Sequence, residues 1–223
     1  MQYQSELFNP DNMKPLPCKS SVFQSNKGIT IKQDSLDDIK TPTEDEHQFA
    51  ILARQLLHGR EVNSAWLQMT KNNNPTGNND RQAKFRCDFT LSANGQVIGY
   101  IDPERKTYWK ANGWPYPKIN IARYPMQHWE ENRITGRETN KLIAFRELPA
   151  MSFWVGVRTD WQVCVIVDAQ TLFEQGRDAM QGTRYKSESL PVIELPNELG
   201  TLCQNADEFT EYIIRMYKER CCD

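Results

Sequence analysis

The chain has 223 residues, of which 39% are hydrophobic and 25% charged, a composition typical of a soluble globular protein with one domain. Its formal net charge of −2 argues neither for nor against a nucleic acid as partner. The sequence has no signal-peptide pattern and no apolar run of about 18 residues, so we expect a cytoplasmic protein that does not span a membrane.

The N-terminal part of the chain predicts an extended arm followed by a helix. Residues 1–42 are polar and interrupted by prolines, so we predict a polar arm ahead of a single domain over residues 43–223. A capping-box pattern at Thr43 and Glu46 precedes apolar residues at helical spacing and predicts a helix that ends near Gly59. A helical or irregular piece and a loop rich in asparagine then lead to the next element; they span Val62–Met69 and Lys71–Asp80.

The next element, Phe85 to Lys106, is the most informative stretch of the chain. Apolar and polar residues alternate on both sides of the turn pattern Asn94-Gly95, which predicts a β-hairpin. A two-residue loop would place Asp88 opposite Ile101, so the acidic face of one strand would mix with the apolar face of the other. A three-residue loop with a bulge avoids this mixing, and burial favours that register. Its apolar face holds Phe85, Cys87, Phe89, Leu91, Val97, Gly99 and Ile101, and its other face holds Asp88, Asp102, Glu104 and Lys106.

Pro103 interrupts the second strand of the hairpin. Proline has no amide hydrogen to donate to a sheet. We therefore predict that this strand lies at an edge of its sheet, or that it is bulged or frayed beyond Asp102.

The rest of the chain predicts further helices and strands. We predict a helix within Tyr124–Ile134, strands at Leu142–Phe145, Phe153–Val157 and Val163–Val167, and a helical segment at Thr171–Met180. Asn205 can cap a C-terminal helix with an apolar stripe. There is no internal repeat, so we expect an α/β or α+β fold with a mixed central sheet flanked by helices.

The polar face of the hairpin suggests metal-dependent chemistry. Carboxylate oxygens are the ligands that Mg²⁺ prefers, and a neighbouring lysine can orient a water or stabilise charge on phosphate. We take Asp88 and Glu104 as the principal metal ligands, Asp102 as a further ligand candidate, and Lys106 as the catalytic lysine.

In these residues the chain resembles the PD-(D/E)XK nuclease superfamily, in which an acidic residue on one strand precedes an ExK triplet on the neighbouring antiparallel strand. Asp88 is followed sixteen residues later by Glu104-Arg105-Lys106. The pattern also aligns one step earlier, with Asp102 in the first acidic position and Glu104 in place of the lysine. The resemblance covers about Glu44 to Val167. It implies a restriction-endonuclease-like sheet and hydrolysis of DNA phosphodiester bonds with Mg²⁺ or Mn²⁺.

Cations and aromatic rings follow the hairpin. The stretch from Arg81 to Arg146 contains twelve Lys and Arg residues and six Asp and Glu residues, so its formal net charge is +6. Such a surface can neutralise phosphate while rings stack on bases. We expect nucleic-acid contacts from Tyr108, Lys110, Lys118 and Arg123. The alternative for the rings, Trp114 and Trp129 above all, is that they cover the sheet.

Other functions are weighed against a nuclease. The six cysteines form no CxxC pair and the three histidines no HxxH spacing, which disfavours zinc sites, and phosphate-binding glycine loops are absent. One rival is a catalytically inactive module that keeps a nuclease-like fold and binds nucleic acid or protein. Another is a small inhibitor of a host factor that acts through its aromatic surface.

Overall fold

The computed structural model describes residues 48–58, 60–72, 87–106, 109, 113–124, 129–158, 160, 162–182 and 189–222. The predicted N-terminal arm, the capping box and Phe85 lie outside the described residues. The helix predicted to end near Gly59 is confirmed as α2, Gln48–Leu57. The described part of the chain is a mixed α+β fold.

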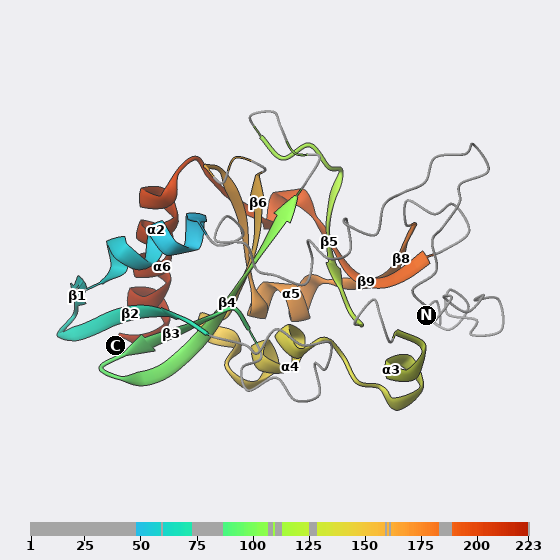
Figure 1. Cartoon of the computed structure of the whole chain (residues 1–223), viewed down its shortest axis with the longest axis horizontal. Coiled ribbons are helices and arrows are strands. Elements are labelled where there is room, and N and C mark those ends of the chain that lie inside the picture. The colour runs from blue at the N-terminus through green and yellow to red at the C-terminus, as the bar shows by residue number, and fades with distance from the viewer. Residues whose placement is uncertain are drawn as a thin grey trace.

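A mixed sheet forms the centre of the fold (Figure 1). Among the described residues it has seven strands in the order β1-β2-β3-β4-β6-β7-β10. They are β1 (Arg60–Val62), β2 (Ala65–Lys71), β3 (Phe89–Ala93), β4 (Gln96–Lys106), β6 (Phe153–Arg158), β7 (Cys164–Asp168) and β10 (Thr201–Cys203). Neighbours are antiparallel except β4 and β6, which run parallel. A parallel pair needs a crossover connection, and this one contains the helices α3 (Trp129–Thr135) and α4 (Asn140–Glu147).

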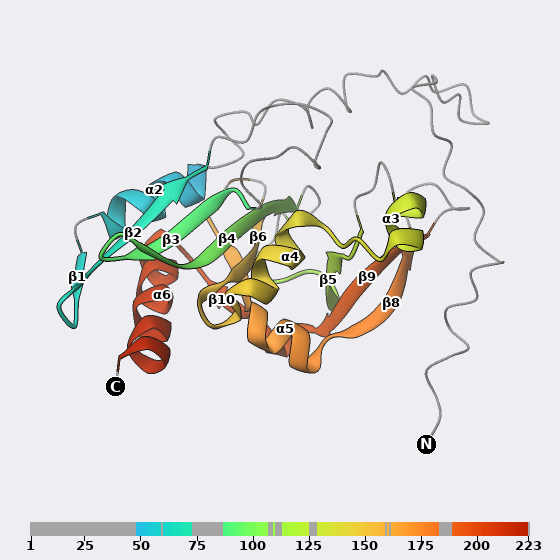
Figure 2. The same cartoon turned by 90° about the horizontal axis from the view of Figure 1, so that it is seen from below.

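A second, smaller sheet lies on the other side of the molecule from α2 and α6 (Figures 1 and 2). Three strands of the described chain form it, in the order β5-β9-β8, and both pairs are antiparallel. The strands are β5 (Lys118–Ala122), β8 (Arg177–Gly182) and β9 (Ser189–Pro196). The remaining elements are α5 (Ala169–Gln175), the 3₁₀ turns η5 (Pro149–Met151) and η6 (Asn197–Leu199), and α6 (Ala206–Cys221).

Each face of the central sheet carries its own hydrophobic core. On one face, α2 and α6 cover the fully buried Phe89, Leu91 and Ile101. On the other face, α4, α5 and the second sheet enclose Trp109 and Trp154. Full burial of one large apolar side chain contributes about 1.5–3 kcal/mol, so these two layers fix the helices on the sheet.

The β3–β4 hairpin confirms the predicted bulge but not the predicted loop. Ala93 pairs with Gln96, so the loop is the two-residue turn Asn94-Gly95 with φ values of 50° and 77°. Ser92 pairs with Val97 and Leu91 with Gly99, which leaves one extra residue on β4. This bulge restores the parity that a two-residue turn would lose, and Phe89 pairs with Ile101.

Two predictions about this hairpin are wrong. Val97 is 47% exposed because it lies between the turn and the bulge. In this part of the hairpin it pairs with Ser92 and shares the polar face with that residue. Strand β4 is neither at an edge of its sheet nor frayed beyond Asp102, since it lies between β3 and β6, continues to Lys106, and pairs Pro103 with Val155 of β6. The neighbouring parallel strand holds β4 in place where the ladder with β3 ends.

Three further predictions need correction. Leu142–Phe145 is not a strand but part of α4, because a short apolar run fits a buried helix as well as a buried strand. Val62–Met69 falls largely on β2, whose alternate residues are buried. Thr171–Met180 is helical only to Gln175 and then enters β8. The predictions for β6, β7 and α6 are confirmed, and Asn205 accepts the cap hydrogen bond from the Glu208 amide at 2.9 Å.

Helix α4 is anchored at its beginning by a cluster of ion pairs. Glu138 accepts hydrogen bonds of 2.8 and 3.0 Å from the Arg146 guanidinium and lies 3.2 Å from Nε of Arg123. Arg123 also pairs with Asp178 of the second sheet. Such paired, half-buried charges hold a helix terminus at a fixed place. The cluster therefore helps to position the first turn of α4 over β4.

Candidate active site

Two carboxylates of β4 point toward the layer that contains α4. Asp102 and Glu104 alternate with Ile101 and Pro103, so they lie on the face opposite the core under α2 and α6. Asp102 is 8% exposed, whereas 39% of the Glu104 side chain is exposed. A buried carboxylate needs a partner of opposite charge or hydrogen-bond donors.

Lys141 of α4 supplies that partner. Its Nζ lies 2.5 Å from Oδ2 of Asp102 and 3.8 Å from Oε2 of Glu104. Lys141 precedes the buried Ala144 and Phe145 by three and four positions, so it shares the sheet-facing side of the helix. The crossover helix thus places an ammonium group against both carboxylates.

Lys106 and Trp154 hold Glu104 from the side. The Lys106 Nζ lies 2.6 Å from Oε1 of Glu104 and 4.9 Å from the centre of the Trp154 ring. The Trp154 indole donates a hydrogen bond of 3.0 Å to Oε2 of the same carboxylate. Both oxygens of Glu104 therefore have partners, and its orientation is fixed.

The charges of this cluster shift one another's protonation. Burial alone would raise the pKa of Glu104, but the ammonium groups of Lys106 and Lys141 lower it to about 2. Burial would likewise lower the pKa of Lys141, but Asp102, Glu104 and Asp88 raise it above its ordinary value. Glu104 is therefore an anion and Lys141 a cation at neutral pH.

Asp88 lies immediately before β3. The last pair of the β3–β4 ladder is Phe89 with Ile101, so the next residue outward on each strand is Asp88 and Asp102. The Asn72 amide donates a bond of 2.7 Å to the Asp88 carbonyl, which fixes the backbone there. The Asp88 carboxylate is near enough to act on Lys141. Lys141 therefore contacts Asp102 and Glu104 directly and also senses the charge of Asp88.

The described residues contain no ready-made group of three or more His, Cys, Asp or Glu side chains that could hold a metal ion. The cation between Asp102 and Glu104 is instead the Lys141 ammonium. Pro103, which could have turned the strand away, does not separate the two carboxylates, since both contact Lys141.

The predicted nucleic-acid contacts are not gathered at this site. Lys118 forms an ion pair with Glu194 of β9, and Arg123 pairs with Asp178 and Glu138. These pairs lie between strands of the second sheet and between that sheet and Glu138, ahead of α4. Tyr108 and Lys110 lie outside the described residues.

The aromatic rings cover the sheet beside the site, as in the alternative interpretation. Trp114 makes edge contacts with Trp109, Tyr116 and Trp154, at centroid distances of 5.1, 4.9 and 6.4 Å. Trp154 in turn bonds Glu104. The ring cluster therefore packs against Trp154, which in turn orients Glu104.

Sequence reasoning missed Lys141 and Trp154. Lys141 escapes prediction because its apolar neighbours Leu142 to Phe145 also fit the pattern of a buried strand. Helical spacing of Lys141 with Ala144 and Phe145 was the available signal. No comparable sequence signal marks Trp154, since its role depends on the pairing of β6 with β4.

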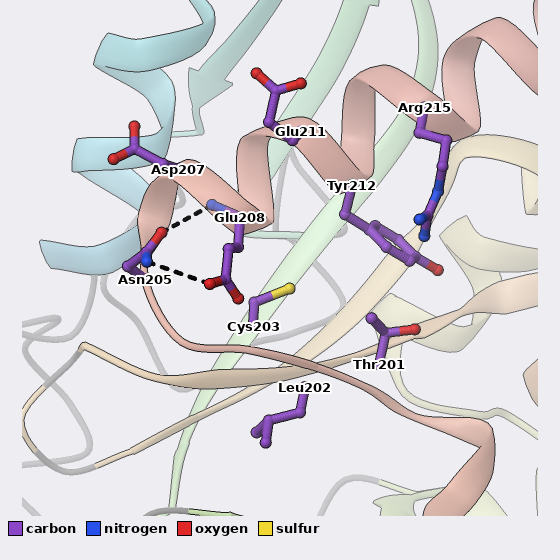
Figure 3. A pocket seen from close by; sticks show the side chains of 9 residues that line it. All are labelled: Thr201, Leu202, Cys203, Asn205, Asp207, Glu208, Glu211, Tyr212 and Arg215. Carbon is purple, nitrogen blue, oxygen red and sulfur yellow. Dashed lines mark hydrogen bonds between the residues drawn. The ribbon is translucent and has the colours of Figure 1, made fainter.

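A shallow hollow lies on the other face of the sheet, between β10 and α6 (Figure 3). Its volume is about 560 Å³, and Cys203, Glu208, Tyr212 and Arg215 are among its lining residues. Glu208 is committed to the helix cap, since its carboxylate accepts bonds from the Gln204 amide at 2.8 Å and the Asn205 side chain at 3.4 Å. Asn205 and Glu208 thus serve the helix terminus, and we do not take the hollow as the active site.

Tyr212 in this hollow predicts a loss of stability at high pH. Burial and the Asp168 carboxylate raise its pKa to about 12, although a hydrogen bond with Thr201 acts in the opposite direction. The folded protein holds the Tyr212 proton more tightly than the unfolded chain, whose tyrosine pKa is about 10. The resulting contribution to stability is complete below about pH 10 and is lost as the pH rises toward about 12. Between about pH 9.5 and about pH 11.5, the urea midpoint of the wild type should therefore fall more steeply than the urea midpoint of Tyr212→Phe. Parallel curves for the two proteins would contradict this.

The comparisons with known proteins give no relative. No family model, no curated protein and no solved structure matches the chain. In the part of the chain that the structure describes, no helix is both long and apolar enough to cross a membrane.

Proposed function

We propose that the chain is a metal-dependent nuclease that hydrolyses phosphodiester bonds of DNA. The observation that carries this proposal is the β3–β4 register: the bulge brings Asp88 beside the face of Asp102, Glu104 and Lys106. That is the arrangement which the resemblance to the PD-(D/E)XK superfamily requires. The proposed location is the cytoplasm.

The sheet topology supports a restriction-endonuclease-like fold. The acidic residue precedes β3, and the ExK triplet lies on the adjacent antiparallel strand β4. The next sheet strand, β6, is parallel to β4 and is reached through the crossover helix α4. Helices cover both faces of this mixed sheet.

The three carboxylates offer the oxygen donors that a hard divalent cation prefers. Asp88 and Glu104 would be its principal ligands and Asp102 a further one, since Mg²⁺ and Mn²⁺ prefer carboxylate oxygens. Such a cation, when bound, polarises a phosphate and lowers the pKa of a coordinated water. Trp154 and Lys106 keep Glu104 oriented, and the lysines can contact the negatively charged phosphate.

A second candidate function is a catalytically inactive module that binds nucleic acid or protein. It is favoured by the ion pairs of Lys141, which already neutralise Asp102 and Glu104 without a metal. An inactive module should bind DNA equally well with and without a chelator and should give no turnover with any metal.

The decisive test is cleavage of plasmid and single-stranded DNA by the purified chain in Mg²⁺, Mn²⁺ or EDTA. The proposal predicts cleavage in Mg²⁺ or Mn²⁺ and none in EDTA. Asp88→Asn, purified in the same way, should lose the activity and serves as the control for contaminating nucleases. Equal cleavage by wild type and Asp88→Asn, or none by either, would contradict the proposal.

A further inference from the structure

We infer that the Lys141 ammonium occupies the place of the divalent cation, so that metal binding and the ion pairs of Lys141 with Asp102 and Glu104 exclude each other. This inference concerns the regulation of the site and rests on the proposed metal-dependent function. Lys141 acts in it as a positioning residue that keeps the carboxylates assembled in the absence of metal.

The distances support a shared position. An ammonium 2.5 Å from one carboxylate and 3.8 Å from a second occupies the space where a cation would meet both. Asp88, the third carboxylate, also acts on this ammonium. A divalent ion a few ångströms from Lys141 would be repelled strongly, because two like charges at this separation are only partly screened near a protein surface.

Lys106 does not have this role. Its Nζ contacts Oε1 of Glu104, whereas Lys141 contacts Oε2 of Glu104 together with Asp102. Lys106 is also held over the ring of Trp154. It can therefore remain in place when a cation enters between Asp102 and Glu104.

Lys141 can leave its position. Its side chain is 19% exposed, so a path to solvent is open, and its flexible four-carbon stem belongs to the first turn of α4. A DNA phosphate is a natural new partner for the displaced ammonium. Metal and DNA should therefore strengthen each other's binding.

The first test measures Mn²⁺ binding by calorimetry without DNA. Lys141→Met should bind Mn²⁺ about 10-fold more tightly than the wild type, because it removes a competing charge. Lys106→Met is the matched control, since it removes a lysine that pairs with Glu104 but not with Asp102, and its gain should be clearly smaller. Glu104→Gln should lose binding.

The second test follows Lys141 directly. The protein is labelled with an amine-reactive acetylating reagent with and without Mn²⁺, and the modified lysines are quantified by mass spectrometry. Labelling of Lys141 should rise several-fold with Mn²⁺. Lys218, which is exposed on α6, serves as the reference and should not change.

The outcomes separate this inference from the proposed function. If the wild type binds Mn²⁺ while Lys141→Met binds no tighter and Lys141 labelling does not rise, the inference is overturned and the proposed function stands. If only Lys141→Met binds Mn²⁺, the inference stands, and the wild type is the inactive module instead of a nuclease. If neither protein binds Mn²⁺, both are overturned.

Discussion

Glu104→Gln is expected to reduce metal-dependent DNA cleavage by at least about 100-fold. Replacing a residue that only supports a metal ligand lowers activity by about 10–100-fold, and replacing the ligand itself should lower it more. Glutamine keeps the shape of the side chain but removes the anion that Lys106 and Lys141 hold with a pKa of about 2. It can still accept the indole hydrogen bond from Trp154. The rate of plasmid nicking at saturating Mg²⁺ measures the effect.

The matched control for this variant is Glu194→Gln. Glu194 is also a strand carboxylate paired with a lysine, Lys118, but it lies on the second sheet. Its replacement should leave cleavage within about 3-fold, since the ion pair is partly exposed and contributes little. If Glu104→Gln cleaves DNA as fast as Glu194→Gln, Glu104 is not a ligand.

The second large effect is expected for Gly99→Ala, which should destabilise the protein by about 3 kcal/mol. Gly99 follows the bulge of β4, and a Cβ there would lie 1.8 Å from the backbone oxygen of Met151. Neither backbone can move freely, because Leu91 pairs with Gly99 on one side and η5 packs on the other. Urea unfolding followed by tryptophan fluorescence measures the loss.

Gly95→Ala separates crowding from backbone strain. Gly95 has a φ of 77°, and a Cβ at this position would have nothing within 4 Å, so only the strain of about 1 kcal/mol remains. Equal losses for Gly95→Ala and Gly99→Ala would show that the close contact of Gly99 with Met151 does not limit the strand.

The acidic face of the hairpin could be predicted because side-chain alternation depends on parity alone. Phe89, Leu91 and Ile101 can be buried on one face only if the hairpin contains one extra residue, either in its loop or as a bulge in a strand. The sequence does not determine which of these positions the extra residue takes. Asn94 and Gly95 favour a two-residue turn because both adopt positive φ values, and the extra residue therefore forms a bulge in β4.

The role of Lys141 could not be predicted with the same reasoning. It depends on the crossover between the parallel strands β4 and β6, which brings α4 over the carboxylates. Contacts between elements far apart in the chain leave little periodic signal. The ion pairs of Lys118 and Arg123 could not be predicted for a related reason, since their partners lie on β8, on β9 and ahead of α4.

The most direct test of the account is a crystal structure with Mn²⁺, in which anomalous scattering locates the metal. The account predicts a peak bound by the carboxylates of Asp88 and Glu104, with the Lys141 ammonium withdrawn from Asp102. A crystal saturated with Mn²⁺ that shows no peak at these carboxylates, with Lys141 still paired to Asp102, would contradict it.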